Sequence, residues 1–223
     1  KIRATDILFP EGGMHRISGI YKGNYKADYF NEISASLIYD SISETLKQLK
    51  KGEKIRIIEI GAGIGGTSEA IFNKLILFKD HIEYIYTDIS RSFLFYAEEN
   101  FRDRAPYMQT ELFNIEQSAV TQCIPLGAGD IVIGTNVVHA TKDIAHTLSN
   151  IKALLKKNGL LILNEIAENE LITTLTFGLL DGWWLHEDNE LRLEGSPGLS
   201  SANWKIVLEE LGYQETAIFL KNC

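Results

Sequence analysis

Apolar positions recur at helical spacing in the first quarter of the chain. Asn31 has the character of a helix N-cap, and apolar residues then return every three or four positions from Ile33 to Leu49. Gly52 follows, and glycine commonly ends a helix. The pattern therefore predicts one helix that begins at Asn31 and ends at Gly52. The residues before Asn31 are rich in glycine and aromatic side chains and show little periodicity.

From position 55 onward, short apolar runs alternate with amphipathic segments. Lys156 and Lys157 suit the negative end of a helix dipole, and Gly159 suits the left-handed residue that ends a helix. The run 160–163 is continuously apolar, as in strands covered by helices on both faces. The expected strands are 55–60, 82–87, 107–113, 131–133 and 160–164, and the expected helices are 70–78, 90–101 and 144–155.

This alternation predicts an α/β fold with a doubly wound parallel sheet and right-handed crossovers. The stretch 167–200 interrupts the rhythm and ends in a Ser-Pro-Gly turn, so we interpret it as a lid inserted after the fifth strand. A helix over 203–211 and a strand over 213–219 complete the prediction. We expect an N-terminal lid and helix over 1–52 and a core over 53–223, together a single domain cut from a longer chain.

A glycine-rich loop follows the first predicted strand and opens the first helix after it. Gly61, Gly63 and Gly66 match the GxGxxG spacing of dinucleotide-binding loops, in which the backbone approaches a pyrophosphate. Glu59, at the end of the strand, suits a cationic ligand such as S-adenosylmethionine better than a pyrophosphate. The loop alone leaves both cofactors open, together with a plain glycine turn.

Polar residues at the ends of the next two strands extend this candidate site. Asp88 follows the second strand, where a carboxylate accepts hydrogen bonds from ribose hydroxyls or caps the next helix. Asn114 and Ile115 follow the third strand, where an amide suits the edge of adenine and an apolar side chain suits its face.

A histidine and a carboxylate end the fourth and fifth strands. In a sheet built outward from the first strand, these two strands are neighbours about 4.8 Å apart, and the fourth borders the first. His139 and Glu165 are therefore expected side by side at the edge of the cofactor crevice. A histidine oriented by a carboxylate can act as a general base near neutral pH.

Composition excludes several classes of protein. The chain has 22 basic and 30 acidic residues, a net charge of −8, which argues against a nucleic-acid partner. Its apolar runs are far shorter than the roughly 20 residues of a membrane span, and its start is not a signal peptide. Two cysteines, Cys123 and Cys223, provide neither a disulfide framework nor zinc-ligand spacing. We expect a cytoplasmic domain without a metal.

Several longer motifs resemble one family, the S-adenosylmethionine-dependent C-methyltransferase domains of modular bacterial polyketide synthases whose acyltransferases act in trans. The motifs are LFP (8–10), IYKGN (20–24) with ADYFN (27–31), EIGAG (59–63), TDIS (87–90), NVVHAT (136–141), FGLLDGWW (177–184) and SPGLS (196–200). The glycine loop occurs in many methyltransferases, whereas NVVHAT and FGLLDGWW are specific to this family. One departure is Asn114, where relatives often carry Asp.

The resemblance implies a Rossmann-like class I methyltransferase fold and methylation of the α-carbon of a β-ketoacyl thioester. The substrate would be tethered through phosphopantetheine to an acyl carrier protein, with neighbouring synthase domains as further partners. His139 matches the catalytic histidine and Glu165 its partner. Gly61, Gly63, Asp88 and Ile115 match cofactor-binding positions of the family. From their places in the predicted fold we also expect cofactor contacts from Glu59, Ile89, Asn114 and Asn136, and a substrate pocket lined by Tyr25, Tyr29 and Trp183.

Three alternatives stay open from the sequence. An O-methyltransferase acting on a hydroxyl or an enol would use a similar base. A catalytically silent domain would keep the fold and only bind the cofactor or space its neighbours. A dehydrogenase would use the same glycine loop for a nicotinamide cofactor.

Overall fold

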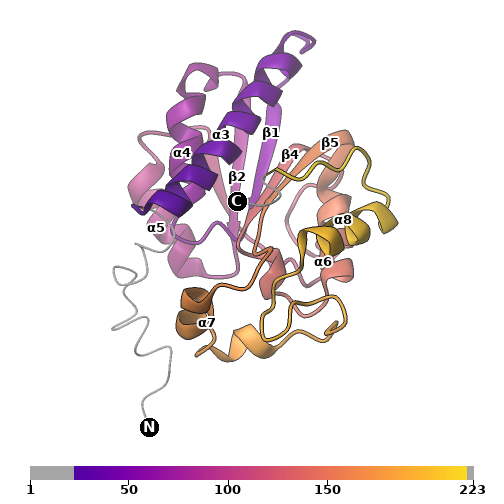
Figure 1. Ribbon diagram of the computed structural model, residues 1–223. Helices are drawn as coiled ribbons and strands as arrows, with labels where there is room; N and C mark the ends of the chain where they lie inside the picture. Colours follow the sequence, from indigo (N-terminus) through magenta and orange to yellow (C-terminus); the bar gives the residue numbers. More distant parts are fainter. Residues whose placement is uncertain (1–22, 220–223) are drawn as a thin grey trace.

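Five parallel strands form the centre of the computed structural model, which describes residues 23–219. Their order in the sheet is β3-β2-β1-β4-β5 (Figure 1). The predicted doubly wound sheet is therefore confirmed, and so is the position of β4 between β1 and β5. The strands are β1 (Ile55–Ile60), β2 (Ile82–Asp88), β3 (Met108–Leu112), β4 (Gly129–Thr135) and β5 (Leu155–Asn164).

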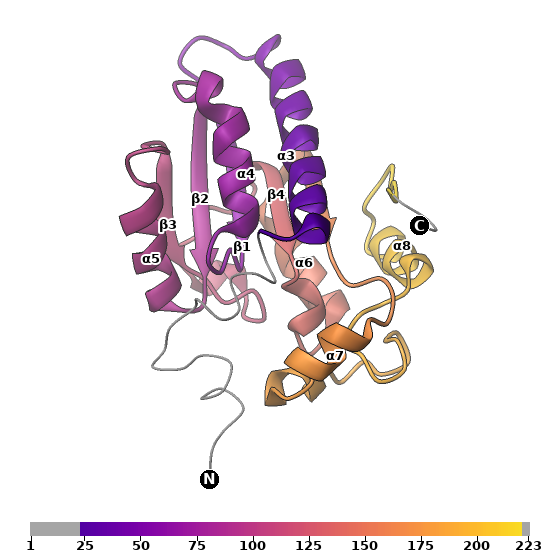
Figure 2. The same ribbon diagram turned by 60° about the vertical axis from the view of Figure 1, so that its left-hand side comes forward.

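Helices cover both faces of this sheet. One face carries α3 (Tyr25–Leu46), α4 (Gly66–Leu75) and α5 (Arg91–Phe101), and the other carries α6 (Ile144–Leu154) and α8 (Ser201–Glu210). The views in Figures 1 and 2 agree that α3 lies beside α4. Because apolar residues from Ala35 to Leu46 of α3 share the hydrophobic core of the sheet, this helix is part of the α/β layer. The domain boundary at residue 52 stays a prediction.

Side chains of successive strand residues enter opposite cores. Ile57 of β1 packs in the cluster that contains Phe72 of α4, whereas Ile58 packs in the cluster that contains Leu148 of α6. This alternation is the two-residue period of a β-strand. Each such fully buried isoleucine contributes about 1.5–3 kcal/mol of transfer free energy.

The first helix begins earlier than the sequence pattern predicts. Its N-cap is Asn24, not Asn31: the Asn24 side chain accepts a hydrogen bond of 2.9 Å from the Ala27 N–H. The first helical turn has no apolar stripe to reveal it, because it faces the cleft and solvent instead of the core. The helix also ends at Leu46, before Gly52, and Leu49 extends the apolar pattern only because the following turn packs against the same core.

The connection from α6 to β5 also differs from the prediction. The helix ends at Leu154, and the residue with a left-handed backbone is Asn158, at φ 63°, not Gly159. Asparagine tolerates this conformation better than most residues. Gly159 is required for another reason, since a Cβ there would lie 2.9 Å from the Gly129 carbonyl oxygen of β4. Of the apolar run 160–163, only Ile162 is buried, because β5 is an edge strand of the described sheet.

The interrupting segment is a set of short helices and loops outside the sheet. It contains α7 (Leu171–Phe177) and the 3-10 helix η5 (Asp181–Trp184), and α8 follows it. Residues 213–219 pair with no strand of the described chain, so the predicted final strand is wrong for this structure. Among residues 23–219, no helix has the length and apolar character needed to cross a membrane.

Candidate functional site

The carboxyl ends of β1, β2, β4 and β5 meet at one edge of the sheet and line a large cleft. The start of α3 and the inserted segment contribute its other walls. An ion pair between Lys26 of α3 and Glu170, the N-cap residue of α7, joins these two walls. Every site residue predicted above lines this cleft. The functional role of each one remains a prediction.

Two glycines of the loop after β1 have left-handed backbones but different surroundings. Gly61 has φ 57°, and a Cβ there would lie 2.3 Å from a methyl carbon of Val137. Gly63 has φ 59°, and a Cβ there would meet nothing within 4 Å. Gly61 is thus needed for packing against the β4 loop. Gly63 leaves open space in the cleft, where a ligand can approach the backbone.

Asp88 connects the end of β2 to this loop. Its carboxylate accepts hydrogen bonds from the N–H groups of Gly63, at 2.9 Å, and Ser90, at 2.8 Å. Burial raises the pKa of this carboxyl above its ordinary value, and the backbone hydrogen bonds oppose the rise. Ser90, and not Asp88, occupies the N-cap position of α5. Asp88 therefore fixes the loop and still lines the cleft.

Glu59, at the end of β1, lines the cleft and has one carboxylate oxygen bound within the core. Its contact with a cationic ligand stays a prediction. Glu59 Oε2 accepts hydrogen bonds from the hydroxyls of Ser68 on α4, at 2.5 Å, and Tyr84 on β2, at 2.6 Å. Burial is the main cause that raises the pKa of Glu59 to about 7, and these two hydrogen bonds oppose it. Burial also raises the pKa of Tyr84 well above its ordinary value. The Glu59 side chain thus joins three core elements beneath the loop.

The residues after β2 and β3 form another part of the cleft lining. Ile89 is 71% exposed, whereas Ile115 is buried in the core beneath the cleft. Asn114 is held by a hydrogen bond from its backbone N–H to the Gln122 side chain and another from the Glu116 N–H to its side-chain oxygen. These contacts leave the Asn114 NH₂ group without a partner in the described chain.

Two polar residues end β4 beside the glycine loop. Asn136 has a left-handed backbone, at φ 51°, and its N–H donates to the Asn164 carbonyl of β5. The Thr135 hydroxyl is buried and has no hydrogen-bond partner within residues 23–219. A buried hydroxyl without a partner is costly, so it points to a polar ligand group in the cleft. The sequence reasoning missed Thr135, although its position at the end of β4 was a usable signal.

His139 and Glu165 lie together, on the 3-10 helix η4 (Val138–Ala140) and after β5. The imidazole Nδ1 is 2.5 Å from Glu165 Oε2, and the two side chains are 7% and 3% exposed. The same carboxylate accepts hydrogen bonds from the N–H groups of Val137, Val138 and His139, at 2.9 to 3.3 Å. Because the carboxylate is an acceptor, Nδ1 carries the hydrogen and the neutral ring keeps Nε2 as its acceptor.

The three predicted pocket aromatics differ in exposure. Tyr25 is 88% exposed and stacks on Tyr29, with ring centroids 6.3 Å apart. Trp183 is buried, and its ring lies edge-on to His139, with centroids 6.4 Å apart. The Trp183 indole N–H is buried and has no partner in residues 23–219.

No group of three or more metal-ligating side chains occurs in that part of the chain.

Known proteins resemble this chain in both sequence and structure. Residues 58–161 match the family model described as a methyltransferase domain. Polyketide synthase PksR of Bacillus subtilis is 52% identical over 215 residues, which are 96% of this chain and 8% of that protein. The chain belongs to the methyltransferase domains of polyketide synthases.

Solved structures support the same family. The DszA carbon methyltransferase has a TM-score of 0.92 and 43% identity, with 96% of this chain and 55% of that chain covered. The trans-methyltransferase CalH, solved in complex with SAH, has a TM-score of 0.75 and 28% identity, with coverage of 95% and 55%. This methyltransferase domain spans about half of those solved chains and less than a tenth of PksR.

Proposed function

We propose that this domain transfers a methyl group from S-adenosylmethionine to the α-carbon of a β-ketoacyl thioester carried on an acyl carrier protein. The observation that carries the proposal is the buried contact between His139 Nδ1 and Glu165, at the same edge of the sheet as the glycine loop. The similarity to the DszA carbon methyltransferase supports carbon as the atom that is methylated.

The cleft residues fit S-adenosylmethionine. Open space at Gly63 admits the cofactor next to the backbone, and Asp88 offers carboxylate oxygens for the ribose hydroxyls. The free Asn114 NH₂ group suits the edge of adenine, and the unpartnered Thr135 hydroxyl offers one more polar contact. When bound, S-adenosylmethionine supplies an electrophilic methyl group on a sulfonium sulfur. Tyr29, near the start of α3, offers an aromatic face that suits a cation.

His139 removes the proton that the reaction must displace. A carbon flanked by a ketone and a thioester carbonyl is acidic, and Nε2 accepts its proton while the C–H electron pair passes into an enolate. The Glu165 carboxylate balances the positive charge of the resulting imidazolium and keeps the ring in one orientation. General base catalysis of this kind contributes about 10²–10⁴-fold.

The inserted segment excludes water from this reaction. Trp183 covers one side of His139, and Phe177 stacks on Trp183 with parallel ring planes. A hydrophobic cover keeps water away from the enolate carbon, so that solvent does not protonate this carbon before it is methylated. The large cleft, lined by the start of α3 and by α7, suits a substrate on a long arm, as the phosphopantetheine of a carrier protein provides.

A panel of acylated carrier proteins tests the proposal. The chain is incubated with S-adenosylmethionine and carriers that bear either a β-ketoacyl or the corresponding β-hydroxyacyl group, and the products are weighed by mass spectrometry. We expect one added CH₂ on the β-ketoacyl carrier alone, with fragmentation placing it on the α-carbon. A methyl on oxygen would establish an O-methyltransferase instead. Cofactor binding without any methylated product would establish a silent domain.

A further inference from the structure

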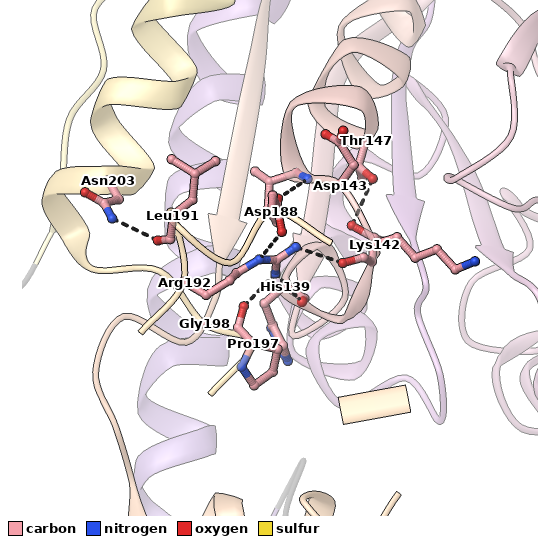
Figure 3. A network of polar contacts seen from close by, with 12 residues as sticks. His139, Lys142, Asp143, Thr147, Asp188, Leu191, Arg192, Pro197, Gly198 and Asn203 are labelled. Carbon is pink, nitrogen blue, oxygen red and sulfur yellow. Dashed lines mark hydrogen bonds and ion pairs between the residues drawn. The ribbon is translucent and has the colours of Figure 1, made fainter. Parts of the chain in front are cut away.

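A buried arginine of the inserted segment is bonded to the backbone turn that carries His139. The Arg192 side chain is 1% exposed, and it lies between Asp188 and the Ser-Pro-Gly turn at residues 196–198. Figure 3 shows its guanidinium surrounded by acceptors from three separate segments. The sequence motifs quoted above do not include Arg192, and neither the candidate cofactor contacts nor the proposed base uses it.

Four hydrogen bonds hold this guanidinium in place. Arg192 Nε donates to Asp188 at 2.5 Å, and Nη1 donates to the carbonyls of His139 at 2.7 Å and Pro197 at 2.6 Å. Nη2 donates to the Thr141 carbonyl at 2.9 Å. Two of the four acceptors therefore belong to the residues at and just after the proposed base. A planar guanidinium presents its donors in a fixed fork, so it constrains both carbonyls at once.

Asp188 completes this arrangement by neutralising Arg192 and reaching the next helix. Its Oδ2 accepts a hydrogen bond of 2.8 Å from the N–H of Ile144, the first residue of α6. The neighbouring Glu187 N–H donates to the Lys142 carbonyl, also at 2.8 Å. Residues 187–192 thus contact the chain at several points from His139 to Ile144 (Figure 3).

The turn that bears His139 is consequently bound by two opposite charges. On one side Glu165 accepts hydrogen bonds from the N–H groups of residues 137–139. On the other side Arg192 donates to the carbonyls of His139 and Thr141. With both kinds of backbone group engaged, the turn cannot rotate without breaking a buried, charge-assisted hydrogen bond.

We propose that Arg192, paired with Asp188, is a positioning residue that fixes the His139 imidazole against its substrate. This inference rests on the proposed function, in which His139 is the base. Arg192 touches only the backbone of that residue, so its loss changes the position of Nε2 and leaves the chemistry of the ring intact. A displacement of about 1 Å at a reacting group can lower a rate by about 100-fold.

The test compares Arg192→Met and Arg192→Lys with a control in the full 223-residue chain. Arg56→Met is the control, because Arg56 forms its ion pair with Glu83 near the amino end of β1, away from the cleft. For each variant we measure kcat and KM with a β-ketoacyl carrier, the Kd for S-adenosylmethionine and the melting temperature. Nuclear magnetic resonance of protein labelled with ¹⁵N-histidine detects the proton on His139 Nδ1.

Arg192→Met is expected to lower kcat by about 10- to 100-fold, with the carrier KM and the cofactor Kd within about threefold of wild type. The Nδ1 proton signal should broaden or shift, and Arg192→Lys should restore part of both losses because it keeps the charge. The control should stay at the wild-type rate. Asp188→Asn provides a second variant if both Arg192 variants fail to fold, and it should lower kcat in the same selective way.

Two results would overturn the inference. One is a folded Arg192 or Asp188 variant with wild-type kcat and an unchanged Nδ1 signal. The other is a loss of kcat that is accompanied by a similar fold-loss of cofactor affinity and by a lower melting temperature, which would assign Arg192 to general stability. Full activity of His139→Ala would instead refute the base itself, and with it the proposed function. The two failures are therefore distinguishable.

Discussion

Alanine at Gly61 and alanine at Gly63 should damage this domain in different ways. The two residues have nearly the same left-handed backbone, at φ 57° and 59°, so both substitutions carry the same conformational cost of about 1–2 kcal/mol. Only at Gly61 does the new methyl group collide with a neighbour, because the Val137 side chain would lie 2.3 Å away. Val137 is β-branched and stiff, so this overpacking adds about 1–3 kcal/mol.

We therefore expect Gly61→Ala to lower the free energy of unfolding by about 2–5 kcal/mol and Gly63→Ala by about 1–2 kcal/mol. In the folded protein, Gly63→Ala should weaken cofactor binding more than Gly61→Ala, because the Gly63→Ala methyl enters the open space of the cleft. Its Kd for S-adenosylmethionine should rise about tenfold or more, equivalent to about 1.4 kcal/mol. Urea unfolding and calorimetric titration measure the two quantities. Equal losses of stability in the two variants, or unchanged cofactor affinity in Gly63→Ala, would refute this reasoning.

Three further substitutions test other parts of the account. Glu165→Gln should lower kcat by about 100-fold at unchanged cofactor affinity, since an amide cannot balance an imidazolium charge; a wild-type rate would contradict the pairing. The pKa of Glu59 is raised from 4.5 to about 7 in the folded chain. Between these two pH values the folded state keeps a proton that the unfolded state has lost, so the contribution of Glu59 to the free energy of unfolding falls as pH rises toward 7. Because glutamine stays neutral, the free energy of unfolding of Glu59→Gln, measured with urea, should rise relative to wild type by up to about 1 kcal/mol per pH unit across this range. A difference between the two proteins that does not change with pH would refute the raised pKa. Asn24→Ala should lower the free energy of unfolding by about 1 kcal/mol through loss of the helix cap, while an unaltered value would place the true start of α3 elsewhere.

The sheet and the contact between His139 and Glu165 followed from the sequence because both rest on general rules. Buried strands that alternate with helices specify a parallel sheet, and the strand order then brings β4 next to β5. Residues that end these strands must therefore meet. The same rule placed Asp88 and Gly63 near each other, and a hydrogen bond joins them in the structure.

The orientation of Glu59 could also have been inferred. Residues 55, 57 and 59 of β1 share one face of the sheet, and the first two are buried against α3 and α4. The carboxylate of Glu59 faces the same way and reaches Ser68 of α4. The two-residue period therefore explains the contacts of Oε2, and the ligand contact of Glu59 stays a prediction.

Arg192 lay beyond any inference from the sequence alone. Three of its four acceptors are backbone carbonyls, which every residue has, and two of them are more than fifty positions away. No sequence spacing or residue type predicts such a contact. The start of α3 was missed for a related reason, because its first turn presents no apolar face to the core.

The rate of His139→Ala tests the central claim most directly. The control is His81→Ala, since His81 lies exposed just before β2, at the opposite end of the strands from the cleft. With a β-ketoacyl carrier, we predict that kcat falls at least about 100-fold in His139→Ala and stays at the wild-type value in His81→Ala, with equal affinity for S-adenosylmethionine in both. A folded His139→Ala chain that methylates its substrate as fast as His81→Ala would contradict the account.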